Sequence, residues 1–328
     1  MAATANQPGL TVIVAAVDDY ATVLEALRAV EDQTAFADIE LLVVLDSLTR
    51  FAAPADFAEL HPRARVLEAG RPLLLNEARA IGIEHARADF VLLLEDHCLP
   101  TRDCLANIIA RLREGRWSVV GPAFASGNRH SVWGRAANLL TYGEWMGYGR
   151  AEARAFVSGY SSAWRRESLR RLGPALEQEL AIPSRLQQRL RQAGEHLYFE
   201  PSAVMLHWEA SYLRHVGRIL LKQGLGMGFV RQGASPLLGK LRASLLVPGL
   251  VLHRTLRGAR AWSRTRTRSL RVLLAIPGLS LIWCAGELLG YWTRDAQQAV
   301  RGVSEVERNR QPFIDEEREP IRRPWSKP

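Results

Sequence analysis

The first half of the chain alternates short apolar runs with segments of helical periodicity. The apolar runs are residues 10–17, 39–45, 64–68 and 90–94. An apolar run without alternation indicates a strand that is buried on both faces. Residues 76–88 are typical of a helix, with Asn76 as its expected N-cap. Strands that alternate with helices of this length predict an α/β fold with a mostly parallel sheet flanked by helices.

Acidic side chains follow these runs directly. Asp18 follows the first run, Asp46 the second, and the triplet Glu95-Asp96-His97 the fourth. Taken singly, Asp18 or Asp19 is more simply explained as a cap of the helix that follows and Asp46 as the start of a turn, while the triplet is equally a polar strand end. Together they fall at the carboxyl ends of successive strands, where open α/β sheets bind ligands. Glu95 and His97 are two residues apart on an extended chain, so they point the same way and could share a cation.

Glycine motifs that bind phosphate are absent from the sequence. No G-x-G-x-x-G follows the first run, and G-x-x-x-x-G-K-[ST] occurs nowhere. This disfavours a dinucleotide-binding fold or a P-loop. If the acidic strand ends bind a diphosphate, a cation must take the role that a glycine loop has elsewhere.

The order of these features resembles the amino-terminal half of family-2 glycosyltransferases of the GT-A fold. The resemblance is carried by the two strand–Asp junctions, the helix beginning NEARAIG at Asn76, and the segment LLLEDHCLP. It implies that Glu95, Asp96 and His97 replace the family's D-x-D motif. That motif binds a divalent metal, here Mn²⁺ or Mg²⁺, which holds the diphosphate of a nucleotide-sugar donor.

The resemblance also assigns the nucleotide contacts. It implies that Asp18 and Asp46 contact the nucleoside and that Arg79 and Asp96 face the nucleotide, with Asp96 also catalytic. Relatives carry a pair of acids after the second strand, and this pair is only partly kept because Leu45 precedes Asp46.

The second half of the chain extends the likeness. The segment VSGYSSAWRR at 157–166 is similar to the family's G-x-N-x-x-x-R-R segment, with Ser161 near the place of the Asn. Residues 185–207 are similar to R-L-x-x-x-G followed by P-x-A-x-x-x-H. This implies that His207 completes the metal site. On its residues alone, a histidine at the end of an apolar strand is equally a satisfied core residue.

The chain departs from the family where the catalytic base is expected. Relatives carry an acidic pair just before the R-L helix, and here the equivalent residues are Ile182-Pro183-Ser184. We expect Glu179, in a loop leading into that helix, to be the general base. The alternative is that Glu179 is a solvated loop charge.

A basic region lies in the last third of the chain. Between Glu209 and Glu287 there is no acid, while thirteen Lys and Arg residues occur there. Subtracting these thirteen charges from the net charge of +9 leaves the remainder at −4. The arginine-rich residues 254–271 lie between two apolar segments, 244–252 and 272–292. This favours an anionic membrane surface as the partner. Nucleic acid is not expected as a partner, because the segment contains no recognisable nucleic-acid-binding motif.

Two features qualify this basic region. Residues 272–292 are long enough to span a bilayer, but Pro277 and Glu287 weaken that interpretation because a carboxylate in hydrocarbon is costly. The glycine-rich residues 223–228 indicate a helix break or close packing.

The cysteine pattern and the first segment indicate the compartment. The three cysteines form no CxxC pair, and the first segment has no secretory signal, so we expect a reducing compartment.

Four regions are expected: a nucleotide-sugar-binding half at 1–125, an acceptor-side half at 126–210, a helical membrane-associating region at 211–295 and a loosely ordered tail at 296–328. The expected function is metal-dependent, inverting transfer of a sugar, in the hexosyltransferase class. The acceptor would be a glycan or a lipid-linked molecule at the cytoplasmic side of the cell membrane, with the enzyme peripheral or held by one re-entrant or spanning segment.

Two alternatives stay open. The missing acid pair allows a catalytically degenerate relative that acts as a scaffold in polysaccharide assembly. A nucleotidyltransferase on a related fold would need a glycine-rich basic loop after the first strand, and residues 15–19 (AAVDD) do not supply it.

Overall fold

The computed structural model describes residues 7–17, 19–232, 235–293, 302, 305 and 311–323. Asp18 lies outside the described residues. The chain divides into two compact units. Unit 1 comprises Met1–Phe124, Gly149–Leu206 and Arg322–Pro328, and unit 2 comprises Ala125–Tyr148 and His207–Ile321.

The sheet of nine described strands has the order β3-β2-β1-β4-β8-β6-β9-β5, with β7 paired to β9. The strands are β1 (Leu10–Ala16), β2 (Ile39–Leu45), β3 (Ala64–Glu68), β4 (Phe90–Leu94), β5 (Cys98–Pro100), β6 (Val119–Ser126), β7 (Glu152–Ala153), β8 (Ala163–Arg165) and β9 (Leu197–His207). The apolar runs in the sequence therefore became strands with nearly the expected bounds.

The first four strands are parallel, as the sequence predicts. β1 pairs with β2 from Leu10↔Ile39 to Ala16↔Leu45, and it pairs with β4 on its other side. β8 is antiparallel to both β4 and β6. The fold is thus a mixed α/β sheet of the GT-A kind, in which the carboxyl ends of β1, β2 and β4 share one edge.

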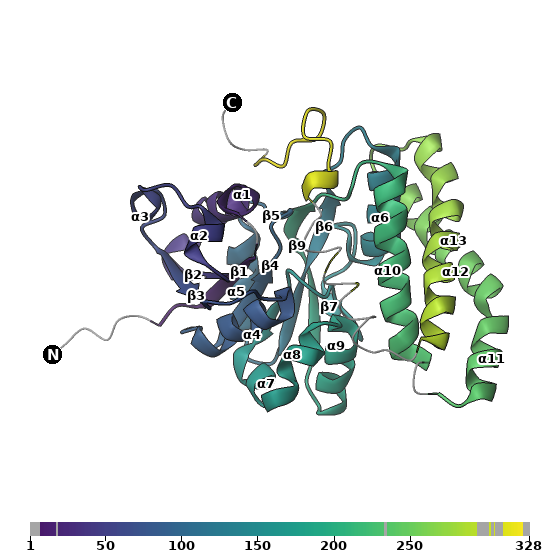
Figure 1. Ribbon diagram of the computed structural model, residues 1–328, viewed down its shortest axis with the longest axis horizontal. Coiled ribbons are helices and arrows are strands. Elements are labelled where there is room, and N and C mark those ends of the chain that lie inside the picture. Colours follow the sequence, from purple (N-terminus) through teal and green to yellow (C-terminus); the bar gives the residue numbers. More distant parts are fainter. Residues whose placement is uncertain are drawn as a thin grey trace. The chain divides into compact units, whose positions relative to one another are not determined.

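Helices cover both faces of this sheet. In Figure 1, α1 and α4 lie on opposite sides of β1 and β2. The helices of unit 1 used below are α1 (Tyr20–Glu31), α3 (Phe57–Leu60), α4 (Leu75–His85), α5 (Cys104–Leu112), α8 (Leu176–Leu180) and α9 (Pro183–Gln192).

The expected start of α4 was wrong by two residues. The N-cap is Leu74, and Asn76 is the second residue of the helix. The side chain of Glu77 accepts a hydrogen bond from the backbone N–H of Leu74 at 2.6 Å. This contact satisfies the backbone amide of the N-cap residue, as the glutamate of a capping box does.

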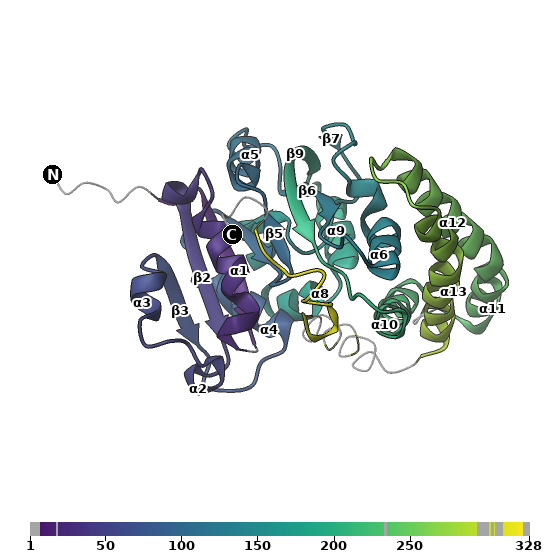
Figure 2. The same cartoon turned by 90° about the horizontal axis from the view of Figure 1, so that it is seen from above.

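Unit 2 is built from helices. They are α6 (Val132–Tyr142), α10 (Leu213–Gln232), α11 (Leu237–Leu245), α12 (Val247–Arg264) and α13 (Leu270–Trp292). In both views α12 and α13 run side by side (Figures 1 and 2). The core between the helices of unit 2 is apolar and includes Leu140 of α6, Ile219 of α10, and Ile276 and Leu279 of α13. Among the described helices, α13 is the one long and apolar enough to cross a membrane, and half of its most apolar window is buried within the fold.

Glycines bring α10 and α13 into backbone contact. A Cβ atom built on Gly224 would lie 2.2 Å from the carbonyl oxygen of Trp283, and one on Gly228 would lie 2.1 Å from that of Glu287. Gly286 and Gly290 meet α10 in the same way. Of the two readings of residues 223–228, close packing is confirmed and a helix break is wrong, because α10 continues to Gln232.

Part of the carboxyl-terminal segment is anchored in unit 2. The carboxylate of Glu319 is 3% exposed and accepts hydrogen bonds from the backbone N–H groups of His130 and Ser131. It also accepts from the side chains of Asn128 and Ser211. These four uncharged donors stabilise a buried carboxylate just before α6, where the helix dipole also favours an anion.

Candidate metal centre

Three predicted ligands meet at the end of the sheet. Glu95 and His97 follow β4, and His207 is the last residue of β9. Each offers one ligand atom, and these atoms all lie within 4.8 Å of one another. All three side chains are buried. One carboxylate oxygen and two imidazole nitrogens form a donor set that suits a divalent transition metal such as Mn²⁺.

Asp96 has a different environment from its two neighbours in the triplet. It is not a member of the three-residue cluster. Its Oδ1 lies 2.7 Å from Nδ1 of His97, and its side chain is 18% exposed whereas His97 is 1% exposed. A carboxylate in this position orients the imidazole beside it.

Glu95 is held by a residue with unusual backbone geometry. The hydroxyl of Ser161 donates to Oε2 of Glu95 at 3.3 Å. Ser161 has a φ of 59°, a left-handed backbone conformation that residues other than glycine adopt only at an energetic cost. Its backbone N–H bonds to the carbonyl of Leu93 at 2.8 Å. The sequence placed Ser161 in a family motif but gave no sign of this strain.

His207 is oriented by an aromatic side chain on α6. The hydroxyl of Tyr142, at the end of α6, lies 3.1 Å from Nε2 of His207, and the rings are 4.5 Å apart. Glu209 lies 3.7 Å from Nδ1 on the other side of the ring. The contact from Tyr142 could not be predicted, because nothing local in the sequence connects α6 with the end of β9. Glu209 is only two residues beyond His207, and its place beside the ring is clear only in the structure.

The predicted nucleoside contacts are only partly described. Asp46 directly follows β2 and is 2% exposed, so it lies at the same sheet edge as Glu95. Asp18 lies outside the described residues. Its neighbour Asp19 accepts a hydrogen bond from the backbone N–H of Thr22 at 3.1 Å, and therefore caps α1 as the simpler explanation predicts.

Arg79 is a buried cation stacked on an aromatic ring. It is 3% exposed, and its guanidinium carbon lies 3.7 Å from the ring centroid of Tyr160. Its Nε forms no hydrogen bond with any residue in the part of the chain that the structure describes. The hydroxyl of Tyr160 donates to the carbonyls of Leu180 and Ala181. The arginine therefore lies near α8, stacked on a ring that is itself bonded to the end of that helix.

Glu179 is neither in a loop nor solvated. It lies in the short helix α8, is 2% exposed, and its Oε1 accepts from Arg185 at 3.1 Å and from Arg189 at 3.0 Å. Both arginines are on α9 and are half exposed. The expected loop position was wrong because Leu176–Leu180 forms a helical turn of its own, packed beside α4.

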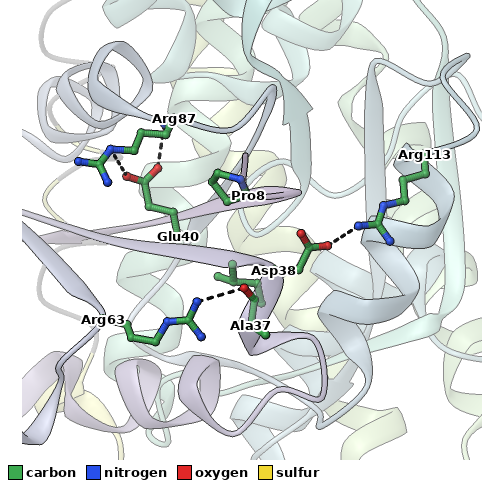
Figure 3. Close-up of a pocket in the computed structure, with 8 residues that line it drawn as sticks. Pro8, Ala37, Asp38, Glu40, Arg63, Arg87 and Arg113 are labelled. Carbon is green, nitrogen blue, oxygen red and sulfur yellow. Dashed lines mark hydrogen bonds and ion pairs between the residues drawn. The ribbon is translucent and has the colours of Figure 1, made fainter. Parts of the chain in front are cut away.

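A cavity of about 590 Å³ lies at the other edge of the sheet (Figure 3). Its lining includes Glu40 near the start of β2, together with Arg63, Arg87 and Arg113, which all bond to neighbouring groups. Burial raises the pKa of Glu40, but hydrogen bonds from Thr11, from the backbone of Arg87 and from Arg65 outweigh it and leave this pKa lowered. The arrangement stabilises charge within the fold, and it lies away from the predicted ligands.

Comparisons with known proteins agree with this geometry. The profile described as glycosyl transferase family 2 matches residues 11–173, about half of the chain. No curated protein matches the sequence.

Solved structures of two transferases are similar to this chain. GalNAc-T7 with UDP, GalNAc and Mn²⁺ has 16% identity and a TM-score of 0.48. The match covers 62% of this chain and 44% of GalNAc-T7, so this chain spans less than half of that protein's length. The mannosyltransferase PcManGT from Pyrobaculum calidifontis, in complex with GDP-Man and Mn²⁺, has 19% identity and a TM-score of 0.50. That match covers 93% of this chain and 88% of PcManGT. At this identity PcManGT supports the fold.

Proposed function

Because this chain belongs to glycosyl transferase family 2 and is a glycosyltransferase, we propose that it moves a hexose from a nucleotide-sugar donor with inversion at the anomeric carbon. The cluster of Glu95, His97 and His207 carries this proposal, since it offers a buried metal site at the carboxyl ends of the strands. Both PcManGT and GalNAc-T7 were solved with Mn²⁺ and a nucleotide.

The donor set fits the metal that the family uses. Two histidines favour Mn²⁺ over Mg²⁺, which prefers oxygen ligands. A metal bound there would offset the negative charge that gathers on the departing diphosphate. The chain's own residues would do the rest: Asp46 would accept hydrogen bonds from the nucleoside, and Arg79 would donate to a phosphate oxygen.

Proton transfer is assigned to Glu179. An acceptor hydroxyl that attacks the anomeric carbon must lose its proton, and a carboxylate beside it would take that proton. Oε2 of Glu179 is buried and has no hydrogen-bond partner in the described part of the chain, so it is the oxygen that would act. Arg185 and Arg189 hold Oε1 and fix the carboxylate's orientation.

We further propose a lipid-linked or glycan acceptor at the cytoplasmic side of the membrane. The basic charge of residues 214–271 and the apolar helix α13 support this location. The assay is transfer from UDP-, GDP- and dTDP-sugars to polyprenyl phosphate and to soluble glycans. Activity with soluble glycans alone would contradict the lipid-linked acceptor.

The first experiment is a thermal-shift screen of nucleotide sugars with Mn²⁺, Mg²⁺ or EDTA. A ligand that binds the native state raises Tm. We expect at least one nucleotide sugar to raise Tm with Mn²⁺, and to lose this effect with EDTA or in His97→Ala. His85→Ala, which removes an exposed histidine at the end of α4, is the matched control. Metal-dependent binding that persists in His97→Ala would refute the site.

One observation favours the second candidate, a scaffold without transfer. Arg185 and Arg189 both pair with Oε1 of Glu179, as they would around a carboxylate whose role is to hold α8 against α9. A scaffold would bind donor with Mn²⁺ but release no nucleotide across the acceptor panel. Release of nucleoside diphosphate in step with acceptor glycosylation would exclude it.

A further inference from the structure

Helix α13 exposes an apolar stripe along its full length. Its most exposed large side chains are spaced three, four, seven or eight residues apart, which places them on one face. They are Leu270, Leu274, Leu281, Leu289 and Trp292, with exposed fractions of 44–69%. Over 23 residues the stripe is about 34 Å long, at 1.5 Å per residue. Large contiguous apolar surfaces are uncommon on soluble monomers and mark interaction sites.

The neighbouring helices extend this apolar surface. On α11, Leu237, Leu238, Leu241 and Leu245 are 45–82% exposed, and on α12 Leu252 and Leu256 are 59% and 49% exposed. The indole N–H of Trp292 donates to the hydroxyl of Ser244 at 3.1 Å, which ties α11 to the end of α13. In Figure 1 the three helices lie next to one another. We call the exposed leucines of these three helices, with Trp292, the leucine surface.

The opposite face of α13 prevents this helix from crossing a bilayer alone. Glu287 is fully buried there and accepts from Arg231 at 2.6 Å, from Arg254, and from the indole of Trp283 at 2.8 Å. Removing these partners would leave a carboxylate in hydrocarbon. A crossing helix would therefore have to keep α10 and α12 beside it.

Helix α10 cannot accompany α13 into hydrocarbon. Gly224 and Gly228 join it to α13 through main-chain contact, so the two helices move together. Its exposed residues include Arg214 and Arg218, one helical turn apart. Two arginines on the outside of a helix at membrane depth have no partner and are costly. This excludes a transmembrane orientation for the pair.

Charge identifies the partner of the leucine surface. Arg264, Arg266, Arg268 and Arg271 are exposed around the turn between α12 and α13, beside Leu270. No acid occurs between Glu209 and Glu287 to offset them. A second copy of this chain would bring an equal positive charge to such an interface, whereas anionic lipid headgroups would neutralise it.

We propose that unit 2 lies on an anionic bilayer as a monotopic anchor, with α13 parallel to the membrane plane. The leucine surface inserts to about 5–10 Å, at the boundary between headgroups and acyl chains. The arginines of the α12–α13 turn contact the headgroups. This inference deepens the proposed membrane location and needs no transfer activity, so it is tested without donor or acceptor.

The first test is co-sedimentation of the full chain with vesicles of phosphatidylcholine alone or with 30% phosphatidylglycerol. We expect at least tenfold tighter binding to the anionic vesicles. Leu274→Glu with Leu281→Glu should abolish binding, and Arg266→Gln with Arg268→Gln should remove most of the preference for anionic lipid. Leu60→Glu changes an exposed leucine of α3 and should bind like the unaltered chain. Equal circular dichroism and Tm would show that each variant folds.

Two results would overturn the proposal. One is vesicle binding that survives Leu274→Glu with Leu281→Glu in a folded protein. The other is a stable dimer in solution that these substitutions dissociate, because a second copy would then cover the surface.

The second test measures depth along α13. A fluorophore is attached to the new thiol of Leu270→Cys, Leu281→Cys or Leu289→Cys, each made separately, and its quenching by brominated lipids is measured. The native Cys98, Cys104 and Cys284 are buried and should not react. An in-plane helix gives similar, shallow depths at all three positions. A clearly deeper position 281, flanked by shallow ends, would establish crossing and refute the in-plane orientation.

Discussion

Nδ1 of His97 lies 2.7 Å from Oδ1 of Asp96, and this contact determines which ring nitrogen can serve a metal. An ionised carboxylate only accepts hydrogen bonds, so Nδ1 carries the hydrogen and Nε2 keeps the lone pair. The aspartate thereby fixes the tautomer and strengthens the imidazole as a ligand. Asp96 would then support the metal site through His97.

Removing the charge of Asp96 should weaken metal binding without abolishing it. We expect Asp96→Asn to reduce Mn²⁺ affinity about 10–100-fold, the usual effect of losing a partner of a ligating histidine. His97→Ala should reduce it further, because a ligand atom is lost. Isothermal titration with Mn²⁺ measures both, with Asp103→Asn, an exposed aspartate, as control. A larger loss in Asp96→Asn than in His97→Ala would make Asp96 itself a ligand.

Tyr142 should matter through His207. Its hydroxyl lies 3.1 Å from Nε2 of His207 and holds the orientation of this imidazole. We expect Tyr142→Phe to lower Mn²⁺ affinity about tenfold while Tm changes little. Tyr148→Phe removes a hydroxyl that bonds to the Gly143 carbonyl and should leave affinity unchanged. Equal Mn²⁺ affinities in the two variants would show that the Tyr142 contact has no role in binding.

Glu179→Gln separates catalysis from binding. If Glu179 is the general base, kcat should fall about 10²–10⁴-fold while Mn²⁺ and donor affinities stay the same. The partners Arg185 and Arg189 are half exposed and remain solvated, so the fold should persist. Glu177→Gln, an exposed neighbour, is the control. Undiminished turnover in Glu179→Gln would remove this residue from the mechanism.

The strands were predictable because each apolar run is buried on both faces. β2 and β4 have the expected bounds, and the parallel pairing follows from the alternation with helices. The start of α4 was not predictable from Asn76, because Glu77 supplies the cap from inside the helix. The hydrogen bond from the Leu74 amide to Glu77, one turn later, thus outweighs the N-cap propensity of Asn76.

The site was predictable only where the chain is continuous. Glu95 and His97 could be paired from their spacing, and His207 entered through a family motif, yet the three meet as one cluster. The burial of Glu179 depends on Arg185 and Arg189, which one sequence does not identify as partners. Tyr142 reaches His207 across 65 residues of intervening chain, a distance over which no local pattern carries information.

Gly228→Ala should destabilise unit 2. The new methyl group would lie 2.1 Å from the carbonyl oxygen of Glu287, so α10 and α13 must separate. We expect a loss of about 1–3 kcal/mol or more, as for overpacked cores. Gly278→Ala has open space and should stabilise α13 by about 0.5–1 kcal/mol. Denaturant unfolding measures both, and equal midpoints would contradict the close approach.

Glu40 should make stability depend on acidity. Its folded pKa lies below the usual value for a glutamate carboxyl, so between the folded and unfolded pKa values the unfolded state binds more protons and stability rises with pH. The contribution is complete above about pH 4.5 and is lost as pH falls through the folded pKa. Glu40→Gln should therefore have a lower free energy of unfolding than the unaltered chain at pH 7. This difference in free energy should narrow toward pH 3.5. Glu59→Gln, an exposed carboxylate, is the control, and a constant gap would contradict the expectation.

The seam between α10 and α13 consists largely of main-chain atoms at Gly224, Gly228, Gly286 and Gly290. Main-chain atoms cannot move aside by changing rotamer. A second substitution within this seam therefore cannot make room for an added methyl group. Revertants of a Gly228 variant should therefore restore glycine itself or map to distant stabilising positions. Over generations these four sites should change far less freely than the leucines exposed on the same helices.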